Sequence, residues 1–259
     1  MSRGTVLVTG ASSGIGAALA KQFANNDYDL VITARREPNL QALKDSLETA
    51  NHVEIVRCDL SDAGGPRELV NMIQAKGIEI DVLVNNAGIA ASEKFDQLAE
   101  EEIDNLMSLN ILALTRLTRH YLPIMIRKGS GRILNVASVA AFQPVPSMSL
   151  YAASKAFVLS LTESLSEELK GTGVTVTALC PGLTRTEMVS QLQAQDIPPF
   201  LISSTDQVAK EGFDALMAKE VIRIPGLANQ AAVTWAQHQP RWLIRGLGGI
   251  LSKFNPNRQ

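Results

Sequence analysis

Three side chains in the middle of the chain have the types and spacing of a proton-transfer site. Tyr151 and Lys155 stand four residues apart in Y-A-A-S-K, and Ser138 lies thirteen residues before the tyrosine. Residues four apart share one face of a helix, so we expect the lysine ammonium beside the phenol. A nearby cation stabilises phenolate and lowers the phenol pKa from its usual value near 10. Such a tyrosine can protonate a carbonyl oxygen or accept a proton from an alcohol.

A glycine-rich turn about 140 residues upstream is the second chemical signal. The segment T-G-A-S-S-G-I-G at 9–16 follows an apolar run and precedes a helical pattern. Glycines let backbone amides approach a pyrophosphate, and a helix N-terminus attracts its charge. The spacing is G-x-x-x-G-x-G, so a plain strand–helix turn is the alternative reading. Combined with the tyrosine, lysine and serine, the turn predicts hydride transfer between a nicotinamide cofactor and a carbonyl or alcohol. The predicted cofactor contacts in the turn are Gly10, Ser12, Ser13, Gly14, Ile15 and Gly16.

The end of the second apolar run, V-I-T-A-R-R, bears on which cofactor binds. A carboxylate there binds the adenosine ribose 2′-hydroxyl and selects NAD. This chain has Ala34 instead, followed by Arg35 and Arg36. Guanidinium groups pair well with a 2′-phosphate, so we predict NADP(H); a solvated charge pair is the alternative. Asp59, after the third run, is expected to accept a hydrogen bond from the adenine amino group, or to cap the next helix.

Apolar runs alternate with helical patterns along most of the chain. Short Val/Ile/Leu runs occur at 5–8, 30–33, 53–56, 82–84, 132–136 and 174–179. The helical segments between them include Ile15 to Phe23, Leu40 to Leu47 and Ile103 to Met125. This alternation predicts an α/β fold of the Rossmann type, a doubly wound parallel sheet with helices on both faces. We expect one domain, with residues 1–226 as its body, a substrate loop at about 183–205, and residues 227–259 as a basic, apolar helical extension.

Composition describes an ordinary globular protein. The chain has 259 residues, 46% of them apolar, and a net charge of −2, which gives no support for nucleic-acid binding. Cys58 and Cys180 are far apart and each closes an apolar run, so we expect buried thiols and no metal site. No run reaches the roughly 18–20 apolar residues that span a bilayer. The first strand leaves no room for a preceding signal peptide, and we therefore expect a cytoplasmic protein.

Taken together, these motifs resemble the classical short-chain dehydrogenase/reductase family over about residues 4–190. The matching elements are the glycine turn at 9–16, Asp59, N-N-A-G at 85–88, Asn110, Ser138, Y-A-A-S-K at 151–155 and P-G at 181–182. The resemblance implies an oxidoreductase acting on CH–OH groups, with Tyr151 as general acid and base and Ser138 orienting the substrate oxygen. It implies that Lys155 lowers the tyrosine pKa and binds the nicotinamide ribose, while Asn110 supports a water linking Lys155 to solvent. With Tyr151 and Lys155, the expected cofactor contacts outside the turn are Arg35, Arg36, Asp59, Leu60, Asn86, Ala87, Gly88, Pro181, Gly182 and Thr184.

The side chains expected around the substrate are mostly apolar, which favours a lipophilic ketone, aldehyde or secondary alcohol. They are Ala140, Phe142, Val145, Pro146, Met148, Leu183, Met188, Val189 and Leu192, with Gln143 as the polar exception. Two alternatives remain. Epimerase-type chemistry uses the same core, but such relatives usually carry a longer C-terminal substrate domain. A non-catalytic NADP(H)-binding redox sensor is the other, but sensors of that kind often lose the tyrosine or the lysine.

The C-terminal segment departs from the family pattern. Many tetrameric members end in a strand followed by an Asp-Gly-Gly-like segment, whereas here E-V-I-R-I-P-G at 220–226 precedes some thirty further residues. No acidic residue follows Glu220, while basic and apolar residues and both tryptophans, Trp235 and Trp242, do. Such a segment packs on its own core or a neighbouring subunit, or lies in a membrane interface. Glycines at 246, 248 and 249 weaken an isolated helix, so we favour packing on protein and expect a homo-oligomer, a dimer or a tetramer.

Overall fold

A single parallel sheet organises the chain. The structure is a computed structural model and describes residues 2–47, 52–185 and 202–246. Within these residues seven strands pair in the order β3-β2-β1-β4-β5-β6-β7, and every pair is parallel. The strands are β1 (Thr5–Thr9), β2 (Asp29–Thr33), β3 (Val53–Ile55), β4 (Val82–Asn85), β5 (Gly131–Val136), β6 (Val174–Leu179) and β7 (Ile222–Arg223). The first six correspond to the six predicted runs, and the two-residue β7 was not predicted.

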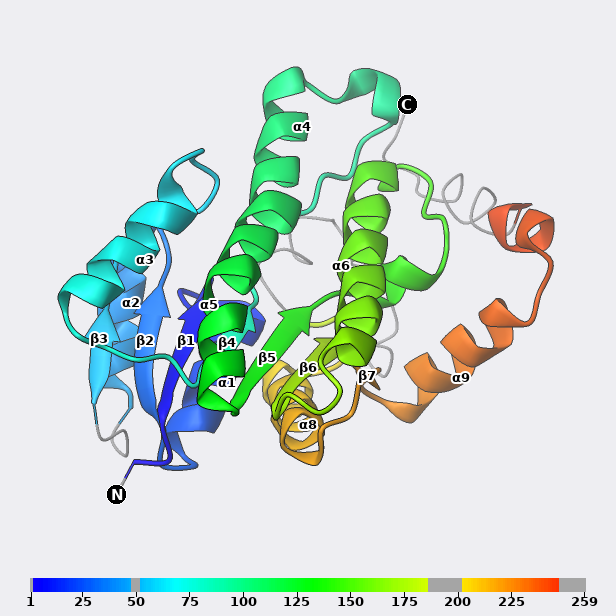
Figure 1. Ribbon diagram of the computed structural model, residues 1–259. Helices are drawn as coiled ribbons and strands as arrows, with labels where there is room; N and C mark the ends of the chain where they lie inside the picture. The colour runs from blue at the N-terminus through cyan, green and yellow to red at the C-terminus, as the bar shows by residue number, and fades with distance from the viewer. Residues whose placement is uncertain (1, 48–51, 186–201, 247–259) are drawn as a thin grey trace.

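Helices cover both faces of the sheet, which confirms the predicted doubly wound α/β fold (Figure 1). The helices are α1 (Gly14–Ala24), α2 (Glu37–Asp45), α3 (Gly65–Ala75), α4 (Glu100–Met107), α5 (Leu114–Lys128), α6 (Ser149–Glu168), α8 (Thr205–Ala218) and α9 (Leu227–Gln237). The described residues also contain three short turns: η1 (Phe95–Gln97), η2 (Ser108–Ala113) and η3 (Val139–Phe142). Figure 1 shows α9 running away from the body of the molecule beside β7.

Alternate side chains of the strands pack into two separate hydrophobic cores, one on each face of the sheet. Val6 and Val8 of β1 pack with buried residues of α1, α2 and α8, whereas Leu7 packs with those of α3, α5 and α6. Successive side chains of a strand point to opposite faces, so a strand covered on both sides is apolar at nearly every position. This is why the predicted strands read as continuous apolar runs.

The strand order reverses beside β1. From β1 the chain proceeds to β2 and β3 on one side, and β4 then lies on the other side of β1. The connections that leave the carboxyl ends of β1 and β4 therefore lead to opposite sides of the sheet, which opens a crevice between them. Open α/β sheets bind their ligands in such a crevice. The fold thus brings the turn after Thr9 next to the N-N-A-G segment after β4.

The long helical pattern between Ile103 and Met125 contains a change of helix type. The segment starts as α4, passes through the π-helical turn η2 and continues as α5. One-turn π segments insert an extra residue into a helix and often occur at functional sites. Here the turn contains Asn110, which is buried. Across the described parts of the chain, the helices are too short or too polar to cross a membrane.

Candidate functional site

A cleft of about 950 Å³ opens at the carboxyl ends of the strands. It runs from the glycine turn and the end of β2, past the segment after β4, to the start of α6 and the P-G-L-T segment after β6. All of the predicted catalytic and cofactor-binding residues line this cleft except Asn110. Residues from seven separate stretches of sequence therefore meet along one surface.

The glycine turn forms one end of the cleft. Gly10 and Gly14 have φ angles of +66° and +58°, which L side chains rarely adopt. A Cβ on Gly16 would lie 2.3 Å from the carbonyl oxygen of Gly10, so the turn excludes any side chain there. Helix α1 begins at Gly14, and the side chain of its N-cap residue, Ser13, makes no capping hydrogen bond. The first amides of α1 are thus left for an anion, as the sequence predicts for a pyrophosphate.

Thr9 and Asn86 hold this turn in place, and the structural role of Thr9 was not predicted. Thr9 Oγ1 donates to the carbonyl of Val84 at 3.1 Å and accepts the amides of Asn86 and Ala87 at 3.0 and 3.1 Å. Asn86 Nδ2 donates to the carbonyls of Thr9 and Gly10 at 2.9 and 3.2 Å. These bonds join the loops after β1 and β4. The signal, a threonine directly before the first glycine, is local, but its partners lie more than seventy residues away.

Arginine side chains occupy the end of β2. Arg36 Nη2 donates to the Ser13 hydroxyl at 2.9 Å and to the Ser12 hydroxyl at 3.3 Å. Arg35 Nη1 lies 3.7 Å from Asp59 Oδ2. The guanidinium groups of Arg35 and Arg36 and two serine hydroxyls therefore lie together at this end of the cleft. The sequence analysis predicts that a 2′-phosphate binds here.

Asp59 does not cap the helix that follows it, because α3 begins only at Gly65. Its Oδ1 accepts the Ser61 amide at 2.9 Å and the Ser61 hydroxyl at 2.6 Å. Burial acts to raise the pKa of this carboxyl, but the bonds from Ser61 and the charge of Arg35 outweigh it, so the pKa is lowered. An ionised Asp59 at the cleft wall is available to accept a hydrogen bond from a ligand.

Ser138 lies at the other end of the cleft, directly after β5. Its Oγ accepts the amide of Ala140 at 3.1 Å, and the next residue, Val139, donates its amide to the carbonyl of Pro181 at 2.9 Å. The serine is thus fixed between η3 and the segment after β6. Because a lone pair of the hydroxyl is used by Ala140, its proton is free to point into the cleft.

Tyr151 projects from the first turn of α6, near Ser138. Burial raises the pKa of its phenol, and a hydrogen bond with the Ser138 side chain opposes that rise only in part. Lys155 Nζ lies 5.7 Å from the centre of the tyrosine ring. The helix therefore places the pair on one face, but the side chains of the protein alone do not produce the predicted lowering of the phenol pKa.

Lys155 forms part of the floor of the cleft and is buried. Its Nζ donates to the carbonyl of Val136 at 2.8 Å, which leaves two further donors on the ammonium. Burial lowers the pKa of Lys155 to about 8, with a small opposing effect from Cys180. The lysine is thus held with its amine directed toward the carboxyl end of β5.

Asn110 lies behind the cleft. Its Oδ1 accepts the amide of Ile89, and its Nδ2 donates to the Ile89 carbonyl and to the Ser154 hydroxyl, at 2.9, 2.9 and 3.1 Å. A Cβ on Gly88 would lie 3.1 Å from Asn110 Oδ1 and 3.4 Å from Lys155 Nζ. Gly88 thus lies close to both groups, and the family resemblance implies that Asn110 supports a water that links Lys155 to solvent.

The wall on the substrate side agrees with the sequence only in part. Ala140, Gln143, Val145, Met148 and Leu183 line the cleft. Phe142 and Pro146 do not, and Phe142 packs instead against the small core beside α6 and β6. Met188, Val189 and Leu192 lie outside the described residues. The sequence analysis missed Ser92, Glu93 and Glu102, which also line the cleft, because nothing local connects the loop after β4 with the start of α4.

Both cysteines are buried free thiols. Burial is the main cause that raises the pKa of Cys58 to about 11 and that of Cys180 to about 12. Groups of three or more His, Cys, Asp or Glu side chains arranged to hold a metal ion are absent from the described residues.

Comparison with known proteins gives a consistent family. The family described as short chain dehydrogenase matches residues 4–197. An uncharacterized oxidoreductase of Bacillus subtilis, YvrD, is 34% identical over 203 residues, which are 76% of this chain and 77% of the relative. A short-chain dehydrogenase from Sphingobium yanoikuyae, solved with NADPH, is 35% identical with a TM-score of 0.82, covering 99% of this chain and 98% of that one.

Two further solved structures are similar to this chain. The bulky-bulky ketone specific alcohol dehydrogenase from Comamonas testosteroni is 31% identical with a TM-score of 0.79, covering 100% of this chain and 98% of that one. A family member from Burkholderia phymatum, solved with NAD, is 27% identical with a TM-score of 0.79, covering 90% of this chain and 92% of that one. These relatives support a nicotinamide dinucleotide as cofactor, and the chain belongs to the short-chain dehydrogenase/reductase family of oxidoreductases.

Proposed function

We propose that this protein is an NADP(H)-dependent oxidoreductase that interconverts a lipophilic ketone or aldehyde and its alcohol. The observation that carries the proposal is the single cleft with the glycine turn at one end and Ser138, Tyr151 and Lys155 at the other. The first end suits a dinucleotide phosphate, and the second suits proton transfer to a carbonyl oxygen. A bound nicotinamide supplies the hydride in reduction and accepts it in oxidation.

The side chains divide the remaining work. In reduction, Tyr151 donates its phenol proton to the carbonyl oxygen, and its raised pKa keeps that proton in place at neutral pH. The Ser138 hydroxyl donates a hydrogen bond to the same oxygen as negative charge develops there. Lys155, with two donors beyond its bond to Val136, holds the ribose hydroxyls of the cofactor and keeps a positive charge near the phenol.

The preference for NADP(H) rests on the residues at the end of β2. Ala34 provides no carboxylate for a ribose 2′-hydroxyl, and Arg35 and Arg36 line the cleft at this point. The bonds from Arg36 to the serine hydroxyls orient one guanidinium toward the glycine turn. A 2′-phosphate adds a doubly charged partner for these guanidinium groups, whereas a bare hydroxyl offers them no charge.

Binding of the two cofactors tests this preference. Titration with NADPH and NADH is expected to show at least a tenfold tighter Kd for NADPH, about 1.4 kcal/mol. The double variant Ala34→Asp, Arg35→Ala is expected to reverse the order, because it removes a phosphate partner and adds a carboxylate. Equal affinities in the wild type would mean that the arginines form only a solvated pair.

The walls of the cleft favour a neutral, apolar substrate. The apolar side chains that line the cleft include Ala90, Val145, Met148 and Leu183, with Gln143 as a polar member. The exposed carboxylates of Glu93 and Glu102 also line the cleft and repel an anionic substrate. The Comamonas relative, named for bulky ketones, is consistent with this choice.

A matched series of aryl ketones tests the substrate class. At low salt, kcat/KM is expected to be a few-fold higher for an uncharged acetophenone than for its para-carboxylate, since each exposed charge contributes roughly half a kcal/mol at about 10 Å in water. The double variant Glu93→Gln, Glu102→Gln is expected to reduce the difference in kcat/KM between the two ketones. The control is the double variant Glu100→Gln, Glu101→Gln, which changes two carboxylates outside the cleft lining. A higher kcat/KM of the wild type for the para-carboxylate would contradict the proposal that the cleft favours neutral substrates.

We also propose that the subunits associate, as is common in this family. Large apolar side chains are exposed on one set of neighbouring helices: Met107, Leu112, Ile124, Ile126 and Phe157. Contact with a second copy would cover them. Light scattering that shows only a monomer at micromolar concentration would contradict this proposal.

A further inference from the structure

The side chain of Asn229 lies against the wall of the cleft. A Cβ built on Gly182 would be 2.5 Å from Asn229 Oδ1 and 2.6 Å from Asn229 Nδ2, so the amide occupies the space of any side chain at 182. Gly182 itself lines the cleft between Pro181 and Leu183. A residue of the C-terminal extension therefore lies directly against backbone that lines the cleft.

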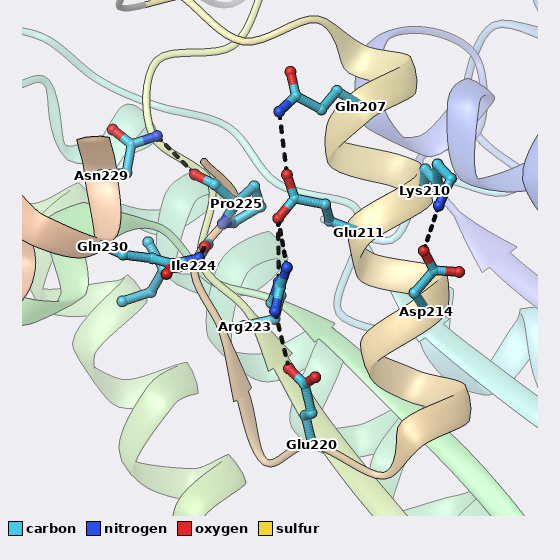
Figure 2. A network of polar contacts seen from close by, with 10 residues as sticks. All are labelled: Gln207, Lys210, Glu211, Asp214, Glu220, Arg223, Ile224, Pro225, Asn229 and Gln230. Atoms are coloured by element: carbon cyan, nitrogen blue, oxygen red, sulfur yellow. Dashed lines mark hydrogen bonds and ion pairs between the residues drawn. The ribbon is translucent and has the colours of Figure 1, made fainter. Parts of the chain in front are cut away.

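Asn229 is itself anchored. Its Nδ2 donates to the Pro225 carbonyl at 2.9 Å, and the Nε2 of its neighbour Gln230 donates to the Ile224 carbonyl at 2.9 Å. Figure 2 shows both side chains reaching from the start of α9 to the backbone that follows β7. Gly226, with a φ of +82°, makes the turn between them. The first turn of α9 is thus tied to the edge of the sheet.

The edge of the sheet is in turn fixed to its neighbours. Arg223 of β7 donates to Glu211 Oε2 of α8 through Nε and Nη2, at 3.1 and 3.0 Å, and its Nη1 lies 3.6 Å from Glu220 (Figure 2). The carbonyl of Arg223 accepts the amide of Cys180 at 2.7 Å. Cys180 directly precedes Pro181 and Gly182. The segment 180–182 is therefore contacted twice, by β7 at Cys180 and by Asn229 of α9 at Gly182.

We propose that Asn229 is a positioning residue for the cleft wall at Pro181 and Gly182, and that α9 therefore supports the reacting end of the site. This inference rests on the proposed function, in which Ser138 acts on the substrate carbonyl, and the bond from Val139 to the Pro181 carbonyl ties the segment after Ser138 to that wall. Gly182 has no side chain with which to pack, and glycine backbone is conformationally permissive. With the amide absent, the segment is free to move toward α9, and displacements of about 1 Å near a reacting centre lower rates by as much as a hundredfold.

A matched pair of variants separates positioning from stability. Asn229→Ala and Gln230→Ala each remove one amide-to-carbonyl bond of the same length from the same helical turn, and only Asn229 contacts Gly182. Both are expected to lower Tm to a similar extent. In the protein without cofactor, hydrogen exchange in the peptide spanning 179–185 is expected to accelerate at least fivefold in Asn229→Ala and less than twofold in Gln230→Ala.

Kinetics provide the second readout. Asn229→Ala is expected to lower kcat for ketone reduction at least fivefold, with a smaller rise in KM, while Gln230→Ala stays within twofold of the wild type. If the two variants behave alike in exchange and in kcat, Asn229 has no positioning role. If Asn229→Ala does not fold, Asn229→Ser, which also removes the amide against Gly182 and keeps a small polar side chain, gives the same comparison with Gln230→Ala. Hydrogen exchange does not depend on turnover. If the wild type reduces no ketone, the proposed function fails, but the exchange comparison between Asn229→Ala and Gln230→Ala still tests the positioning role of Asn229.

Discussion

At the scale of single residues, the site contains two buried groups, Tyr151 and Lys155, whose charged forms are disfavoured by burial. Burial raises the pKa of the Tyr151 phenol and lowers the pKa of the Lys155 amine to about 8. Both shifts favour the neutral form of the side chain. The Tyr151 phenol is thus held protonated at neutral pH, and burial makes the ammonium form of Lys155 less favourable than it is in water.

The pH dependence of stability tests the burial of Lys155. Because its folded pKa lies below the value of 10.5 for a free lysine, the unfolded chain binds more protons between about pH 8 and 10.5, and stability rises with pH there. The free energy of unfolding of the wild type without cofactor, relative to Lys155→Met, is expected to rise by about 2–3 kcal/mol from about pH 7 to about pH 10. Urea unfolding measures it.

Lys128 provides a comparison of opposite sign. A hydrogen bond and ion pair with Asp81 raise the pKa of Lys128, so its contribution is present at neutral pH and is lost as pH rises through the raised value. Wild type relative to Lys128→Met is therefore expected to lose stability as pH rises. The same trend for both lysines would contradict the burial of Lys155.

At the scale of elements, the turn between β1 and α1 sets the geometry of the cofactor end. Gly16 packs directly on the Gly10 carbonyl, whereas a Cβ on Gly64, at the start of α3, would meet no atom within 4 Å. Gly16→Ala is expected to destabilise the protein by about 1–3 kcal/mol, as overpacking does, and to abolish dinucleotide binding. Gly64→Ala is the control and is expected to preserve both. Calorimetry and cofactor titration measure the two effects, and normal NADPH binding by Gly16→Ala would refute this account of the turn.

Local patterns were enough to predict most of these elements. The strands are apolar because both faces are covered, and the turn and the Tyr–Lys pair lie within short stretches of sequence. The contacts that were missed join distant segments: Thr9 to Val84 and Asn86, and Asn229 to Gly182. The expected place of Phe142 was wrong because η3 turns it toward the core beside α6. Such orientations are set by packing across the fold and leave no periodic signal.

At the scale of the whole molecule, the C-terminal extension is the least expected part. Its described portion packs on the protein, since α9 contacts η3 and buries Val233. The same portion leaves Leu227, Trp235 and Trp242 exposed, at 83%, 52% and 67%. Packing on the body of its own chain therefore accounts for one side of α9, while Leu227 and Trp235 of the same helix stay exposed in the described structure.

Deletion of residues 228–259 distinguishes the possible partners. If the extension packs on protein, the truncated chain is expected to lose thermal stability and to change its subunit count, because apolar surface is exposed. Scanning calorimetry and light scattering measure these effects. If it lies on a membrane, the truncated chain keeps its Tm and subunit count and loses a salt-sensitive affinity for anionic vesicles. We expect the first outcome, and the second would contradict it.

The central claim is that this cleft transfers hydride from NADPH to a carbonyl carbon while Tyr151 donates the proton. The direct measurement is reduction of a bulky aryl ketone with NADPH that carries deuterium in place of both hydrogens at C4, followed by mass spectrometry of the alcohol, in the wild type, Tyr151→Phe and Tyr121→Phe. Tyr121 is a buried tyrosine outside the cleft, so its variant controls for the loss of a phenol. We expect deuterium on the carbinol carbon, turnover lowered at least about a hundredfold in Tyr151→Phe, and near wild-type turnover in Tyr121→Phe. An alcohol without deuterium, or equal turnover in all three proteins, would contradict the claim.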